Sequence, residues 1–320
     1  MATQAPTLPG GPVRRRREVP GLLSRIRSHA ADYLYVAPAI IVMLVVIGYP
    51  LVYTVYRSFF FTDARDPSWT WNGISNYTGI LRDDLFWKVT RNTIVWTVGS
   101  TLLAVVLGFV AAMVLHREFI GRGLLRGILL IPWVISAVAA AYIWKWMLHS
   151  DYGLISNQLL AWGWISDPLV VLDDRSRVMP ALVIVNVWKE FPFVMIMVMA
   201  GLQTVPQQLL RAARVDGAST WSQFRHITLP HLNGVLLITT LLLAVTNLNS
   251  FTLPYLMTGG GPANASQLWI TEIYKISFGA GLRYGEASAY SVILFLFMAI
   301  IGYFYVRALT SGGPKMGDGK

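Results

Sequence analysis

Long apolar stretches separated by shorter polar ones make up most of this chain of 320 residues. Six of these stretches last about 20 residues, the length that an α-helix needs to cross roughly 30 Å of hydrocarbon. Strands of a membrane barrel would alternate apolar and polar residues in pieces of about ten, and the sequence shows no such alternation. The pattern therefore predicts an all-α, polytopic membrane protein with six transmembrane helices, at about 35–57, 90–115, 127–148, 179–202, 234–257 and 287–309.

Three of the predicted spans contain a proline that should bend them, because proline removes a backbone hydrogen bond and clashes with the preceding turn. These prolines are Pro50, Pro132 and Pro192. Between the spans, we expect residues 61–88 to form an acidic loop with tryptophans at the membrane interface. A second acidic loop contains residues 154–164, which predict a short amphipathic helix on the membrane surface.

The composition agrees with a membrane protein and excludes several kinds of site. Hydrophobic residues make up 55% of the chain and charged ones 13%, with a mean hydropathy of +0.53, which is too apolar for an ordinary soluble domain. The chain has no cysteine, so disulfides, thiolate metal ligands and cysteine nucleophiles are excluded. The histidines form no HExxH pattern, and no GxxxxGK[ST] phosphate loop occurs. We therefore expect no catalytic residues, no metal site and no cofactor on this chain.

Both ends of the chain lie outside the predicted membrane domain. Residues 1–34 form a Pro/Gly-rich tail with four consecutive arginines, Arg14 to Arg17, which should rest near anionic membrane lipid. The apolar segment that follows is too long for a signal-peptide core, so we predict an uncleaved span. The membrane domain is expected over 35–310, followed by a short tail at 311–320.

Charge sets the expected orientation of the spans. With both termini placed in the cytoplasm, basic residues are more numerous in the inner segments and acidic residues in the outer ones, as the positive-inside rule requires. The net charge of +10 is explained by this topology, so no nucleic-acid partner is expected. The same arrangement places the polar segment 205–230 in the cytoplasm.

The segment from Val205 to Pro230 is polar, basic and rich in helix-forming residues. Proline is favoured at the first helical position, so a helix should begin at Pro206 and continue through 207–215. Gly217 is a natural stop, because glycine takes the left-handed conformation that ends many helices. A second helix should begin at Ser219 or Thr220, where Thr220 and Gln223 have the spacing of a capping box, and Pro230 should end it. The segment thus predicts a helix–turn–helix elbow.

The elbow resembles a known family at the Ala212-Ala213 pair, the Asp216-Gly217-Ala218 triplet and the later Phe224, Ile227, Leu229 and Pro230. This pattern is similar to the cytoplasmic EAA loop of bacterial ABC-importer membrane subunits, which seats a coupling helix in a groove of an ATPase subunit. The resemblance implies that ATP and Mg²⁺ bind the partner ATPase and not this chain. One residue departs from the family, since Arg211 stands where glutamate is usual. The expected coupling residues are Leu210, Arg211, Ala212, Ala213, Asp216, Gly217, Ala218 and Phe224.

A second stretch extends the resemblance to about residues 35–309. The run Leu256 to Pro262, with Tyr274, Lys275 and Phe278 after it, looks like the corresponding segment of carbohydrate-type permeases. Taken alone, its glycines would indicate only a flexible turn. The resemblance implies a bacterial inner-membrane importer that pairs this chain with a second permease subunit as a heterodimer, two ATPase subunits and an extracytoplasmic solute-binding protein. A sugar or oligosaccharide is the expected solute; glycerol 3-phosphate or a polyol is the alternative.

Polar residues inside apolar spans are expensive in lipid and usually face a cavity or another helix. Amides and aromatic rings suit the hydroxyls and apolar faces of a sugar, so these positions are candidates for the substrate pathway. Interhelical hydrogen bonding explains the asparagines equally well, and Lys189 could pair with a carboxylate of another helix. The candidate pathway residues are Asn186, Glu190, Asn247, Asn249 and Phe251.

Two other classes of function are weighed against an ATP-driven importer. A self-sufficient ion-coupled carrier or channel would use Glu190 as a proton or cation site, but such carriers often contain inverted repeats and the sequence shows no convincing one. An intramembrane enzyme would need a paired catalytic constellation. The Asp173-Asp174 pair instead falls in a predicted external loop, where a solvated turn explains it.

Overall fold

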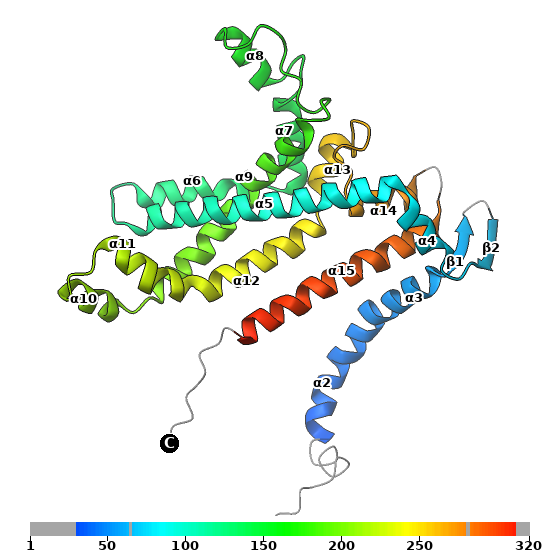
Figure 1. The fold of residues 1–320 in the computed structure, drawn as a ribbon, viewed down its shortest axis with the longest axis horizontal. Helices are drawn as coiled ribbons and strands as arrows, with labels where there is room; N and C mark the ends of the chain where they lie inside the picture. Colours follow the sequence, from blue (N-terminus) through cyan, green and yellow to red (C-terminus); the bar gives the residue numbers. More distant parts are fainter. Residues whose placement is uncertain (1–29, 64–65, 280–281, 312–320) are drawn as a thin grey trace, which may run out of the picture. The chain divides into compact units, whose positions relative to one another are not determined.

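A computed structural model describes residues 30–63, 66–279 and 282–311 of the chain (Figure 1). The outer parts of the two predicted tails, 1–29 and 312–320, lie outside the described residues. By its contacts the chain divides into two compact units, Met1–Tyr53 and Thr54–Lys320.

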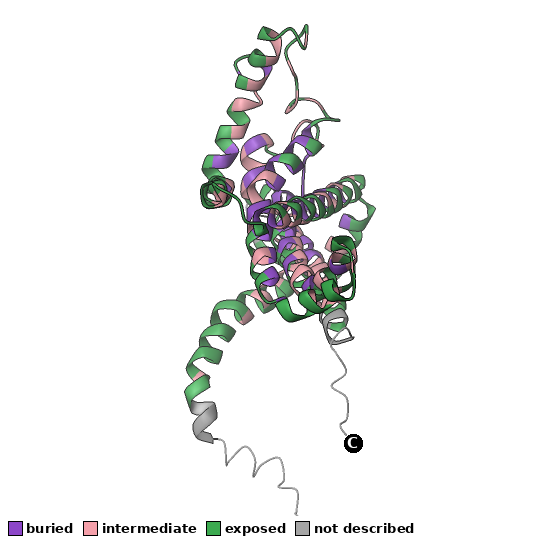
Figure 2. Ribbon diagram, turned by 90° about the vertical axis from the view of Figure 1, so that its left-hand side faces the viewer, coloured by how far each residue is buried: buried purple, intermediate pink, exposed green. Residues whose placement is uncertain are grey.

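The first apolar segment forms one long helical path of α2 (Ala30–Met43), the π-helical turn η1 (Leu44–Gly48) and α3 (Tyr49–Arg57). Its apolar residues lie on the surface of this unit, coloured green in Figure 2, as expected of a helix long and apolar enough to span a membrane. In η1 the Tyr49 N–H donates to the carbonyl of Leu44, five residues back. The departure from regular helix expected at Pro50 thus takes the form of a π turn immediately before that proline.

The second unit is helical apart from one hairpin in the part of the chain that the structure describes. Strands β1 (Phe60–Asp63) and β2 (Asp66–Trp71) pair antiparallel within the segment expected to be a loop. An all-α fold is otherwise confirmed. The helices are α4 (Ser75–Arg82), α5 (Asp84–His116), α6 (Arg122–Val134), α7 (Ala137–Met147), α8 (Leu154–Ala161), α9 (Val178–Gln203), α10 (Gln207–Val215), α11 (Thr220–Gln223), the π turn η2 (Phe224–Thr228), α12 (Leu229–Leu248), α13 (Thr252–Thr258), α14 (Trp269–Phe278) and α15 (Tyr284–Ser311).

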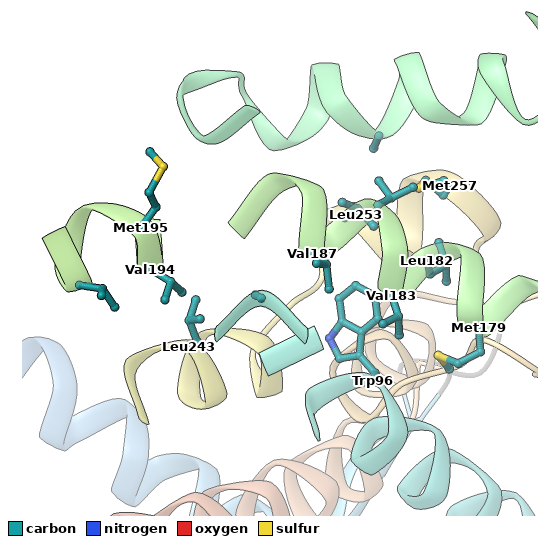
Figure 3. Close-up of a cluster of buried hydrophobic side chains, with 14 of the residues drawn as sticks. Trp96, Met179, Leu182, Val183, Val187, Val194, Met195, Leu243, Leu253 and Met257 are labelled. Carbon is teal, nitrogen blue, oxygen red and sulfur yellow. The ribbon is translucent and has the colours of Figure 1, made fainter. Parts of the chain in front are cut away.

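Helices α5, α9 and α12 pack against one another and form the core of this unit. Trp96 of α5 is completely buried, and Figure 3 shows it beside Val183 and Val187 of α9. Glycine allows α5 and α9 to approach closely, because a Cβ atom at Gly108 would lie 2.5 Å from Cβ of Val194 and 2.6 Å from the carbonyl oxygen of Phe191. The core therefore depends on one small residue at the centre of the α5–α9 contact.

Helices α5, α9 and α15 confirm the second, fourth and sixth predicted spans, although α5 and α15 begin earlier than expected. Among the described residues, five helical segments are long and apolar enough to cross a membrane, or six if one bent pair counts as a single span.

The third predicted span, at 127–148, is not one continuous helix. Helices α6 and α7 meet at an angle of 94°, and the backbone between them is extended at Ile135 and Ser136. Pro132 does not end α6, which continues to Val134. The carbonyl of Ser136 accepts from the Ala140 N–H at 2.9 Å, whereas that of Ile135 accepts from Nζ of Lys189 at 3.2 Å.

The fifth predicted span, at 234–257, has different boundaries. The helix runs from Thr220 through η2 and α12 to Leu248, so Pro230 does not end a helix as expected. The π turn η2 precedes Pro230 as η1 precedes Pro50, and the Leu229 N–H donates to the carbonyl of Phe224. The span ends at Leu248 because the polar residues that follow leave helical geometry, and α13 is a separate short helix.

The acidic segment before α9 contains the short helix that was predicted, although α8 ends at Ala161 rather than at residue 164. Near the end of the segment lies Asp174, whose carboxylate accepts hydrogen bonds from the N–H and hydroxyl of Ser176 and from the N–H of Arg177. These bonds favour the charged form and lower the pKa of Asp174 below its ordinary value. Asp174 thus fixes the turn from which α9 starts.

Candidate functional site

The elbow between α9 and α12 has the two-helix form expected for 205–230. Helix α10 ends at Val215, and Gly217, two residues later, has left-handed backbone geometry with a φ of 76°. The Ala218 N–H donates to the carbonyl of Ala213 at 2.9 Å, and the Gly217 N–H donates to that of Arg214 at 3.1 Å. This pair of bonds is a Schellman motif, which requires the positive φ that glycine adopts without strain. The predicted role of Gly217 as the helix stop is confirmed.

Of the two helix starts in the elbow, the first differs by one residue from the prediction, and the second, at Thr220, agrees with it. Pro206 is the cap of α10 rather than its first helical residue. Helix α11 is capped by Ser219, whose hydroxyl accepts from the Ser222 N–H at 3.2 Å. The side chain of Gln223 does not complete a capping box with Thr220, and its Nε2 donates to the carbonyl of Ala218 at 2.8 Å. Backbone bonds therefore close the turn at Gly217, and side-chain bonds of Ser219 and Gln223 hold the residues that follow it.

The elbow presents large apolar and basic side chains to its surroundings. Val215 is 88% exposed and Trp221 is 67% exposed, and both lie within a segment whose arginines are also exposed. Such a patch on a short polar loop is typical of a protein contact. Among the predicted coupling residues, Arg211, Ala212, Asp216 and Gly217 are exposed, and Leu210, Ala213, Ala218 and Phe224 are half-buried.

Phe224 connects the elbow to the helix bundle. Its ring packs on Trp221 at 5.4 Å and on Phe109 of α5 at 6.1 Å between ring centroids. A cleft of 310 Å³ lies behind the elbow, between α10, α11 and the last turn of α5, with Met113 and His116 in its wall. Helix α11 continues through η2 into α12, so the second half of the elbow and that helix form one continuous helical segment.

Asn186 and Asn247, both candidates for the substrate pathway, lie together in the core. Nδ2 of Asn186 donates to Oδ1 of Asn247 at 2.8 Å, and Nδ2 of Asn247 donates to the hydroxyl of Thr101 at 3.1 Å. Nε1 of Trp96 donates to the backbone oxygen of Asn247 at 3.0 Å. We call Thr101, Asn186 and Asn247 the polar joint. It connects α5, α9 and α12, and its buried contacts are those of interhelical hydrogen bonding.

The other candidate pathway residues lie apart from the polar joint. Glu190 is half-buried on α9. Its neighbour Lys189 contacts the Ile135 carbonyl rather than a carboxylate of another helix. Asn249 is exposed, and its Nδ2 donates to the carbonyl of Val245 at 2.9 Å. The structure therefore does not assemble the five candidates into one surface.

Phe251 belongs to an aromatic group that the sequence argument missed. Its ring packs on Tyr255 at 4.7 Å and on Tyr274 at 4.8 Å, and Tyr274 packs in turn on Phe278 at 5.1 Å. We call these four residues the aromatic wall. A signal was present in the sequence, because Phe251 with Tyr255 and Tyr274 with Phe278 are two i,i+4 pairs and each pair shares one helix face.

The glycine-rich segment after α13 is ordered by hydrogen bonds. The hydroxyls of Thr258 and Ser266 bond to each other at 2.7 Å, and the Ser266 hydroxyl also donates to the Gly261 carbonyl at 2.6 Å. From α5, Nζ of Lys88 donates to the carbonyl of Ala263 at 2.7 Å, and Asn92 bonds the next carbonyl. The segment is therefore not a flexible turn, because these hydrogen bonds order it and attach it to the first turns of α5.

Residues 104–310, which include the elbow, the polar joint except Thr101, and the aromatic wall, match the sequence family described as binding-protein-dependent transport system inner membrane component. The chain is 34% identical over 285 residues to the trehalose/maltose transport system permease protein MalF of Thermococcus litoralis, covering 88% of this chain and 95% of that protein. It is 32% identical over 282 residues to the sulfoquinovosyl glycerol transport system permease protein SmoG of Agrobacterium fabrum, covering 87% and 90%.

The fold is also similar to a solved structure. A chain in the crystal structure of a bacterial alginate ABC transporter, in complex with an alginate pentasaccharide-bound periplasmic protein, matches with a TM-score of 0.75. The match covers 89% of this chain and 95% of that one at 21% sequence identity. At this identity the likeness is one of fold.

Proposed function

Because the chain belongs to the family of binding-protein-dependent transport system inner membrane components, we propose that it forms half of the translocation pathway of an importer for a sugar or oligosaccharide. The proposed importer contains a second permease subunit, two ATPase subunits and an extracytoplasmic solute-binding protein. ATP and Mg²⁺ bind the ATPase subunits, and this chain supplies the membrane path. The substrate class is proposed from the trehalose/maltose and sulfoquinovosyl glycerol permeases to which the chain is similar.

The observation that supports coupling to an ATPase is the exposed elbow. It is a short two-helix segment with an apolar and basic surface, and it is closed by the Schellman motif at Gly217. Helix α12 continues from it without interruption. A partner that moves the elbow would therefore move α12 and, through the polar joint, α5 and α9. The elbow is proposed to face the cytoplasm, where an ATPase has access to ATP.

Replacing Gly217 tests this coupling. Gly217→Asp forces a non-glycine residue to a φ of 76°, although a Cβ atom there would meet no other atom within 4 Å. Strain of about 1–2 kcal/mol should therefore distort the elbow without disturbing the bundle. We expect normal membrane insertion and loss of ATP-driven uptake. The measurement is uptake of radiolabelled sugar, set against the amount of the chain in the membrane.

Gly121→Asp is the matched control. Gly121 also has a positive φ, 87°, and a Cβ atom there would meet no other atom within 4 Å, but the residue lies in the loop between α5 and α6. It should retain uptake. Wild-type uptake by Gly217→Asp would contradict the coupling role.

Affinity purification of the tagged chain from its own membranes tests the larger assignment. An ATPase subunit should copurify with it. Uptake into liposomes by the chain alone, without any ATPase, would instead support an ion-coupled carrier or a channel.

A further inference from the structure

A cavity of 580 Å³ opens between α7, α13 and α14, away from both the elbow and the polar joint. It lies near the first turns of α5, because Lys88 and Asn92 of that helix bind the glycine-rich segment that follows α13. The elbow contacts the last turns of the same helix. The cavity and the elbow thus lie at opposite ends of α5, a helix of 33 residues.

Aromatic side chains form one side of the cavity. Three residues of the aromatic wall, Tyr255, Tyr274 and Phe278, line it. Tyr255 and Tyr274 meet edge to face at 5.0 Å, which leaves other ring surface free, and Phe278 is 69% exposed. Ring faces of this kind pack well against the apolar C–H faces of a sugar ring. This side of the cavity is therefore suited to a carbohydrate.

Two lysines line the cavity as well, Lys145 from α7 and Lys275 from α14. Nζ of Lys145 donates one hydrogen bond to the carbonyl of Leu256 at 3.0 Å, so the ammonium group is held at the edge of α13. An ammonium group has three donors, and two remain for a ligand. Lys275 is exposed next to Tyr274. The cavity thus has two positive charges beside its aromatic side.

No carboxylate among the described residues lines this cavity to neutralise the two lysines. Glu272 of α14 is close in sequence, but it is 4% exposed and its Oε2 accepts from Nε2 of Gln267 at 2.8 Å. That contact directs the Glu272 charge into the protein. A neutral solute would leave both ammonium groups without a negative partner, whereas an acidic solute would form charge-assisted hydrogen bonds with them.

The walls of the cavity are fixed before any ligand arrives. The Trp269 N–H, at the start of α14, donates to the hydroxyl of Thr93 at 3.0 Å, and its Nε1 donates to the hydroxyl of Thr90 at 2.9 Å. Both threonines belong to α5. Helix α13 is held to α7 by the Lys145 bond. Such preorganisation reduces the entropy that binding must offset.

We propose that this cavity binds an acidic sugar residue, one that bears a carboxylate or a sulfonate. The sugar ring packs on Tyr274 and Phe278, and the acidic group accepts hydrogen bonds from both Lys145 and Lys275. The inference rests on the proposed sugar importer and narrows its substrate class to anionic glycans.

The test uses the full-length chain in lipid nanodiscs, with trigalacturonate as the acidic probe and maltotriose as the neutral one. Saturation-transfer-difference NMR detects binding even when the affinity is weak. We expect trigalacturonate to bind at least tenfold more tightly than maltotriose. Lys275→Gln should weaken trigalacturonate about tenfold, because one charge-assisted hydrogen bond is lost. Phe278→Ala, at an exposed position, should weaken both probes.

Arg175→Gln is the matched control, since Arg175 is an exposed cation outside the cavity and the substitution removes the same charge. It should leave the affinity for trigalacturonate unchanged. Equal affinity for the two probes, an affinity unaffected by Lys275→Gln, or no binding of trigalacturonate would each overturn the proposal. Copurification of an ATPase is scored separately. If the chain binds trigalacturonate but no ATPase copurifies, the importer function is refuted and the acidic-sugar site is retained. If an ATPase copurifies but trigalacturonate does not bind, the importer function is retained and the site is refuted.

Discussion

For Asn186 and Asn247, position in an apolar span predicts burial but not the hydrogen-bond partner. Their burial was expected from the cost of exposing amides to lipid. Their hydrogen bond to each other could not be predicted, because the two residues are separated by 61 positions in the chain and only packing of α9 against α12 brings them together. A role in the substrate pathway stays a prediction for both. Their contacts in the structure are those of a joint between helices.

The polar joint can be tested by a double-mutant cycle. Asn186→Leu or Asn247→Leu alone should destabilise the bundle by about 1–3 kcal/mol, because each leaves a buried amide unpaired. The double variant should lose less than the sum, with a coupling of about 0.6–2 kcal/mol. Thermal unfolding in detergent, followed by circular dichroism, gives these values. Asn249→Leu is the control, since Asn249 is exposed. Strict additivity would show that the two amides do not stabilise each other.

Arg211 is the residue at which the elbow departs from the resemblance to other importers. It is exposed on α10, near Arg214, so the partner groove should be acidic there. Arg211→Gln should weaken association with the ATPase by about 1 kcal/mol at low salt and by less at high salt. The fraction of ATPase that copurifies at two salt concentrations measures this effect.

Gln208→Glu is the matched variant for Arg211→Gln, because it changes the charge of α10 by the same amount at another exposed position. It should have the smaller effect. If the two variants retain equal ATPase at every salt concentration, only the net charge of α10 matters and no specific contact forms at Arg211.

At the scale of elements, the α5–α9 contact depends on the absence of one side chain. Gly108→Ala would place Cβ 2.5 Å from Cβ of Val194 and should destabilise the bundle by about 1–3 kcal/mol. Gly99→Ala, on the same helix, meets Val183 at an ordinary 3.5 Å and should be neutral or slightly stabilising. Thermal unfolding in detergent compares the two. Equal unfolding temperatures would mean that α5 and α9 can separate at Gly108 without loss.

The spans that could be predicted are those whose helices need no help from other elements. Helices α5, α9 and α15 are continuous and apolar, so hydropathy and length suffice. The break between α6 and α7 could not be predicted in the same way. An extended backbone at Ile135 is tolerated inside an apolar region only where something satisfies its carbonyl, and Lys189 of α9 does so. That contact is a property of the packed bundle.

Among the candidate sites, too, the features set by local sequence could be predicted and those set by packing could not. The elbow was predicted well because its turn is local and Gly217 alone determines where α10 ends. The aromatic wall was not predicted, since Phe251 and Tyr274 come from helices separated by an ordered segment whose course depends on Lys88 and Asn92. Hydrogen bonds between distant parts of the chain therefore account for most of what the sequence argument missed.

At the scale of the whole molecule, the bent α6–α7 pair determines the topology. If the pair crosses the membrane, the described residues make six crossings, which start and end on the same side; if the pair is re-entrant, they make five, which start and end on opposite sides. The absence of cysteine allows this to be measured with single-cysteine variants and no background. We expect Ser166→Cys to react with a membrane-impermeant maleimide from outside the cell, and Ser219→Cys and Ser24→Cys to react only after the membrane is opened.

Each of these positions reports on one side of the bundle. Labelling of Ser219→Cys from outside would place the elbow away from ATP and contradict coupling. Labelling of Ser24→Cys from the side opposite to Ser219→Cys is not compatible with α5 and α6–α7 both crossing.

Each of the two π turns precedes a proline, and each also changes the direction in which the residues before it point around the helix axis. A hydrogen bond that reaches back five residues rather than four admits one additional residue to the turn. In a regular helix one residue corresponds to about 100° of rotation around the axis. Through η2, the elbow thus points to a different side of α12 from the one that an uninterrupted α-helix would select. The direction in which α10 and α11 point around the axis of α12 therefore depends on the number of residues in η2. Deleting one residue from η2 would turn α10 and α11 around that axis without altering any side chain of those two helices.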